Sequence, residues 1–110
     1  MRTYDPRAAA RDALAARPDR PATAMIHDTP DARLVVFRIA PGQAVPAHTN
    51  ASTVVLHVLE GSGMVTGADG EHRVEAGTVV TYEPREPHGM RAIKEELTLL
   101  AVIAPRPANR

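Results

Sequence analysis

From residue 22 onward, short apolar runs alternate with turn-forming residues, and this alternation is the main structural signal in the chain. The runs are rich in Val, Ile, Leu and Thr, which favour strands. Their positions are residues 22–27, 32–40, 52–60, 63–67, 71–75, 78–83 and 97–104. Turns rich in Gly, Pro and Asp separate them, and the stretch GADG at residues 67–70 suits a tight hairpin. Seven short strands at this spacing predict an all-β sandwich or barrel.

The N-terminal segment has a different pattern and predicts an arm with a short helix. The dipeptide Asp5-Pro6 is typical of an N-cap and first turn, and residues 8–17 favour a helix. Leu14 is the only large apolar side chain in this stretch, so we expect a short, lightly docked helix. The sequence therefore predicts an arm over residues 1–21 and one barrel domain over residues 22–110.

The run at residues 52–60 is apolar on both faces, which is unusual for a small barrel. Successive side chains of a strand point to opposite faces, so Val54 and Leu56 lie on one face and Val55 on the other. The outer face of a lone small barrel would be wet and polar. We therefore expect a second layer over this strand, either the chain's own terminal segments or a partner subunit.

The stretch around residue 48 resembles the first sequence motif of the cupin family, G-x5-H-x-H-x3,4-E-x6-G. Gly42, His48 and Gly61 fall at the family positions. Asn50 and Val54 stand where the motif has its second histidine and its glutamate.

A second stretch resembles the other cupin motif. Gly77, Pro84 and His88 match it, and Ala92 stands in the place of an asparagine. Together the two stretches extend the resemblance over about residues 32–104. It implies a small single-domain cupin, an all-β double-stranded β-helix with a short N-terminal helix.

The resemblance also implies a metal site, although this chain has an incomplete ligand set. A complete cupin site takes two histidines and a glutamate from the first motif and one histidine from the second. Of these four ligand positions, this chain keeps a histidine at two, His48 and His88. One divalent transition metal, Zn, Ni, Fe, Mn or Cu, would suit such imidazole ligands, or the site holds none. Metal sites usually have three or four protein ligands, so a third would come from Asn50, Tyr82 or Glu83.

We expect His48 and His88 to line one pocket at the barrel mouth, because small barrels often hold a ligand there. His57 falls on the opposite strand face from this pocket. The remaining predicted lining residues are Asn50, Val54, Leu56 and Met90.

Two functions follow from these residues. The first is a metal-binding protein or metal-dependent enzyme acting on a small organic molecule, as an oxygenase, isomerase or lyase. The alternative is a non-catalytic cupin dimer that binds or senses a small molecule without a metal. The missing ligands favour the binder, whereas the histidine kept in each motif favours retained chemistry.

Composition narrows the partners. The 13 basic and 13 acidic side chains cancel and form no basic run, which argues against nucleic-acid binding. No apolar stretch approaches membrane-spanning length, so we expect no membrane partner. The absence of cysteine excludes disulfides and thiolate metal sites. We expect a cytoplasmic protein with a small-molecule ligand. Small cupins commonly pair through their sheets, and the two-sided apolar strands agree with a homodimer.

Overall fold

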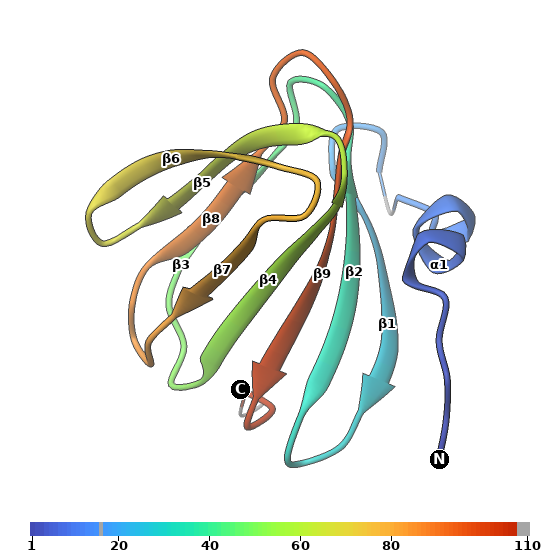
Figure 1. Ribbon diagram of the computed structural model, residues 1–110, viewed down its shortest axis with the longest axis vertical. Coiled ribbons are helices and arrows are strands. Elements are labelled where there is room, and N and C mark those ends of the chain that lie inside the picture. Colours follow the sequence, from blue (N-terminus) through green and yellow to red (C-terminus); the bar gives the residue numbers. More distant parts are fainter. Residues whose placement is uncertain (16, 108–110) are drawn as a thin grey trace.

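The computed structural model describes residues 1–15 and 17–107, which form two facing antiparallel sheets with one short helix beside them (Figure 1). The helix is α1, Pro6–Asp12. The strands of the described residues are β1 Ala22–Asp28, β2 Arg33–Ile39, β3 Ala44–His48, β4 Thr53–Glu60, β5 Ser62–Gly67, β6 Gly70–Glu75, β7 Val79–Tyr82, β8 His88–Arg91 and β9 Leu97–Ala104.

The strand order confirms the predicted all-β class. One sheet has five strands in the order β1-β2-β9-β4-β7, and the other has four in the order β3-β8-β5-β6. Most neighbours in each sheet are distant in sequence, so the chain crosses repeatedly between the two layers. The predicted hairpin at residues 67–70 joins β5 to β6, with Gly67 opposite Gly70.

The described residues contain nine strands, two more than the sequence predicts. The additional strands are β3 and β8, which pair with each other. β3 contains Pro46, a residue that strands tolerate only at edges or bulges, and β8 is only four residues long and contains Gly89. Neither segment carries enough local strand propensity to be recognised, and both form because tertiary pairing supplies their partners.

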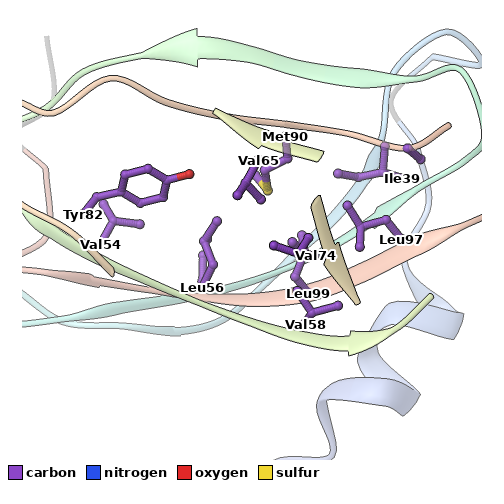
Figure 2. Close-up of a cluster of buried hydrophobic side chains, with 12 residues drawn as sticks. Ile39, Val54, Leu56, Val58, Val65, Val74, Tyr82, Met90, Leu97 and Leu99 are labelled. Carbon is purple, nitrogen blue, oxygen red and sulfur yellow. The ribbon is translucent and has the colours of Figure 1, made fainter. Parts of the chain in front are cut away.

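The space between the sheets is filled by apolar side chains (Figure 2). Along β4, Val54, Leu56 and Val58 all face this interior, as the alternation predicts. The other buried members shown are Ile39, Val65, Val74, Tyr82, Met90, Leu97 and Leu99. Burial of these side chains is the main stabilising contribution of the barrel, at about 25 cal/mol per Å² of apolar surface.

The N-terminal helix is shorter than its propensity suggests. Asp5 caps it by accepting a hydrogen bond from the Ala8 amide, but the helix ends at Asp12, and Ala13 is extended with φ −67° and ψ 137°. The Ala13 carbonyl accepts a 2.7 Å hydrogen bond from the Arg38 guanidinium, and this tertiary contact outweighs the propensity of the following residues.

The helix is short, as the sequence predicts, and it docks through small side chains. Ala10 and Ala13 are buried, whereas Leu14 is 87% exposed, so small side chains rather than the leucine make the contact. The stretch that favours a helix also includes residue 16, which lies outside the described residues. No helix in the described part of the chain is long and apolar enough to cross a bilayer.

Candidate functional site

The structure brings together two histidines that lie forty residues apart in the sequence. His48 ends β3, His88 begins β8, and the two are directly paired across these strands. Their Nε2 atoms are 3.1 Å apart and their ring centroids 4.2 Å apart, with an angle of 65° between the ring planes. Both therefore lie where the β3–β4 loop and the β7–β8 turn meet, at the lower end of the barrel in Figure 1.

A local irregularity and a glycine set this pairing. The β3–β8 register shifts between Val45 and His48, which places the bulge at Pro46 and Ala47. A Cβ at Gly89 would lie 2.9 Å from the Ala47 nitrogen and 3.0 Å from its Cα. Any side chain at residue 89 would thus push β3 away from β8. Local propensity does not reveal this role of Gly89, although a glycine directly after His88 is visible in the sequence.

Backbone carbonyls fix which ring nitrogens carry protons. Nδ1 of His48 lies 3.1 Å from the Pro46 carbonyl oxygen, and Nδ1 of His88 lies 3.1 Å from that of Glu86. A carbonyl only accepts hydrogen bonds, so each Nδ1 carries a hydrogen and donates it. In a neutral ring the Nε2 atom then has a free electron pair. The two Nε2 atoms lie 3.1 Å apart, and when both rings are neutral neither has a hydrogen to donate to the other.

The surroundings favour the neutral form of His88. Burial lowers the pKa of His88, and the neighbouring His48 lowers it further, while the hydrogen bond to the Glu86 carbonyl opposes the shift. His88 is 7% exposed, whereas His48 is exposed at the surface. The pair thus has a buried member whose neutral form is favoured and an outer member open to solvent.

The three candidates for a third ligand differ in their surroundings. The Asn50 side-chain oxygen accepts a hydrogen bond from the Ser52 amide at 3.0 Å. Glu83 is exposed on the β7–β8 turn. No group of three or more His, Cys, Asp or Glu side chains among residues 1–15 and 17–107 is arranged to hold a metal ion.

Tyr82, the remaining candidate, packs against the histidine pair as a neutral phenol. Its ring centroid lies 5.4 Å from that of His88, and its hydroxyl donates a 2.8 Å hydrogen bond to the Thr66 carbonyl. Burial raises the pKa of Tyr82 to about 12, with added effect from the Glu86 and Asp69 carboxylates. Figure 2 shows the hydroxyl directed into the barrel interior.

The predicted lining residues divide into two groups. Val54, Leu56 and Met90 are buried in the apolar cluster. Asn50 lies with His48 on the wall of an open cleft of about 660 Å³ outside that cluster. His57 is exposed, on the face of β4 opposite the interior.

This geometry and the sequence identify the same class of protein. Residues 35–103 match the cupin domain family, and the chain belongs to that family. The fold is the double-stranded β-helix that the sequence motifs imply. A search of curated proteins finds no match.

Solved structures extend the likeness over nearly the whole chain. The TT1209 protein of Thermus thermophilus is 26% identical, with a TM-score of 0.86, over 97% of this chain and all of the other. An RmlC-like cupin of Desulfovibrio desulfuricans is 28% identical, with a TM-score of 0.74, over 86% of this chain and 91% of its own. A Thermotoga maritima protein described as a predicted oxalate decarboxylase is 22% identical, with a TM-score of 0.74, over 78% and 81%. At 22% identity, the likeness to the Thermotoga maritima protein is evidence for a shared fold alone.

Proposed function

We propose that His48 and His88 bind one divalent transition metal at the barrel mouth. The supporting observation is the pair of Nε2 atoms 3.1 Å apart, each with its Nδ1 hydrogen already donated to a backbone carbonyl. When both rings are neutral, neither Nε2 can donate a hydrogen to the other, whereas both can bind one cation.

The separation also suits a shared ion. Imidazole nitrogens lie about 2.0–2.1 Å from zinc. At that bond length, neighbouring ligands are separated by about 2.9 Å in an octahedral site and about 3.3 Å in a tetrahedral site. The observed 3.1 Å lies between these two values.

The same site would act on a small organic molecule as a metal-dependent enzyme of the oxygenase, isomerase or lyase type. A bound divalent ion supplies Lewis acidity, and two protein ligands leave positions for a ligand. The chain contributes orientation, because the Pro46 and Glu86 carbonyls fix both rings. Buried Val54 and Tyr82 close the inner side against water.

A second candidate function is a cupin that binds a small molecule without a metal. The observation that favours it is the ligand count: two imidazoles come together, and Val54, in place of the family's glutamate, is buried among apolar side chains. In this form the exposed His48 would serve as a polar anchor beside the cleft.

Metal analysis of the purified protein separates the two candidates. We expect wild type loaded with Zn²⁺ or Ni²⁺ to retain one ion per chain after dialysis, and His48→Ala and His88→Ala each to lose it. His57→Ala is the matched control, since this histidine is exposed on the other face of β4. Wild type that retains no metal, or retains it equally in all variants, would contradict the metal site.

Two further expectations from the sequence remain predictions. The outer face of the five-stranded sheet carries Val55, Leu100 and Val102, all half-buried, which supports a homodimer through this face. Light scattering at micromolar concentration tests it, and a monomer would contradict it. The cytoplasmic location likewise remains a prediction.

A further inference from the structure

The cleft beside His48 has a charged wall that the histidine pair does not explain. Its lining includes Arg33, from the start of β2, and Arg106, from the segment after β9. The uncharged part of the lining combines the polar residues Thr49, Asn50 and Ser52 with the apolar residues Ala51, Ile103, Pro105 and Pro107. None of the described residues that line the cleft is acidic.

The two arginines share one counter-ion. Nε of Arg33 donates a 3.2 Å hydrogen bond to one carboxylate oxygen of Asp28, and Nη1 of Arg106 lies 3.5 Å from the other. Partial burial opposes ionisation of Asp28, but the hydrogen bonds and charges of both arginines outweigh it and hold the pKa of this carboxyl below its usual range. Two guanidinium groups with one carboxylate leave a surplus of one positive charge.

The position of Arg33 connects this charge to the barrel mouth. Arg33 lies opposite Ile103, which lies opposite Val54, which in turn lies opposite Tyr82. These four residues form one cross-strand row on the inner face of the sheet. The Arg33 side chain is only 19% exposed, and its hydrogen bond to Asp28 is donated by Nε rather than by a terminal Nη group.

The walls of the cleft are tied together in advance of any ligand. The Ser52 hydroxyl donates a hydrogen bond to the Pro105 carbonyl, which joins the β3–β4 loop to the C-terminal segment. The Arg106 amide donates to the Pro30 carbonyl at 3.2 Å, which joins that segment to the β1–β2 turn. A site whose walls are already fixed loses less conformational entropy when a ligand binds.

We propose that this cleft binds the carboxylate of a small organic acid between Arg33 and Arg106, with the apolar body of the acid against Ile103 and the prolines. Guanidinium groups bind carboxylates with paired, charge-assisted hydrogen bonds. A surplus of one charge matches a monoanion rather than a phosphate dianion. The inference deepens the proposed function and rests on it for the role of His48, which would face the same bound acid.

Benzoate is the test ligand, with benzamide as its neutral analogue and inorganic phosphate as the competing anion. Titration by calorimetry in EDTA, with the full chain, measures the cleft without any metal. We expect benzoate to bind wild type and benzamide not to bind. Arg33→Gln and Arg106→Gln should each weaken binding by about tenfold or more, the usual effect of losing a charge-assisted hydrogen bond. Arg73→Gln, which removes an exposed arginine of β6, is the matched control and should bind as wild type.

Asp28→Asn should change benzoate affinity in the direction opposite to the two arginine variants. It therefore separates a role in ligand binding from a structural role. Removing the competing carboxylate should tighten benzoate binding several-fold and make it more sensitive to salt. Weaker binding by Asp28→Asn, tighter binding of phosphate than of benzoate, or no benzoate binding to wild type would each overturn the proposal. Because EDTA removes metal ions from these titrations, none of these three outcomes bears on the metal analysis of His48 and His88. Loss of metal binding with intact benzoate binding would overturn only the proposed metal site.

Discussion

The two ends of the barrel interior are built from the same strands but differ in what their side chains can do. At the closed end, Ile39 lies opposite Leu97, and both are fully buried. At the mouth, the corresponding row of the same sheet begins with Arg33 and ends with Tyr82, against which His88 packs. Each step of two residues along β9 moves one row toward the mouth and keeps the same face, and the same step along the antiparallel β2 moves one row away from it.

The difference shows that the row in which a side chain lies determines whether it packs in the apolar interior or is available for chemistry at the mouth. Side chains of the inner rows, including Ile39 at the end of β2 and Leu97 at the start of β9, are fully buried and must be apolar to avoid burying unpaired polar groups. Side chains at the mouth have the turns and solvent on one side, where the backbone carbonyls of Pro46 and Glu86 orient the two imidazoles. Candidate functional residues therefore concentrate at one end.

Leu99→Ala should give the largest effect on stability. Leu99 is fully buried in the closed half of the interior, and truncation leaves a cavity that costs about 2–5 kcal/mol of unfolding free energy. His48→Ala, at the exposed mouth, should change the unfolding free energy by less than about 0.5 kcal/mol. Urea denaturation of both variants measures the contrast. Equal losses of stability would show that the two ends do not differ as described.

Gly89→Ala should come next, with its effect directed at the mouth. The new methyl group would lie within 2.9–3.0 Å of the Ala47 backbone, and separating β3 from β8 should cost about 1–3 kcal/mol. Because the same movement separates the two Nε2 atoms, we expect metal affinity to fall as well. Gly70→Ala serves as a control with open space around its added Cβ, although its φ of 109° adds local strain. If Gly89→Ala kept both wild-type stability and wild-type metal affinity, the close approach would not matter.

Tyr82→Phe should give the smallest effect at neutral pH. It removes one hydrogen bond to the Thr66 carbonyl, worth about 0.5–1.5 kcal/mol. The pH dependence is more informative, since the folded-state pKa of Tyr82 is about 12 and the unfolded value is near 10. The unfolded chain loses this proton first, so wild-type stability should fall as pH rises from 10 to 12. Denaturation curves across that range should show the fall reduced in Tyr82→Phe.

The sequence predicts the fold much better than the site. The alternation along β4 correctly places Val54, Leu56 and Val58 in the interior, because a face buried in one sheet imposes a period of two. It misses β3 and β8, whose stability depends on each other rather than on local propensity. Those two strands carry His48 and His88, so spacing in the cupin motifs was the available signal that they meet.

Other features of the site depend on contacts that no local pattern encodes. The tautomers of both histidines are set by carbonyl groups two residues earlier in the chain, and only the folded turns aim those carbonyls at Nδ1. The pairing of Arg33 with Arg106 across Asp28 joins residues from three separate segments. Motif spacing contains no information about such a cluster.

The most direct test of the account is nitrogen NMR of the histidine rings at about pH 7.5, where neutral imidazole predominates, before and after one equivalent of Zn²⁺. We predict that Nε2 of both His48 and His88 is unprotonated in the free protein, and that both Nε2 signals move together on zinc addition while those of His57 and His72 do not. A hydrogen on Nε2 of either neutral ring, or a zinc response confined to one member of the pair, would contradict the central claim that the two Nε2 atoms at the barrel mouth are both free to bind one ion.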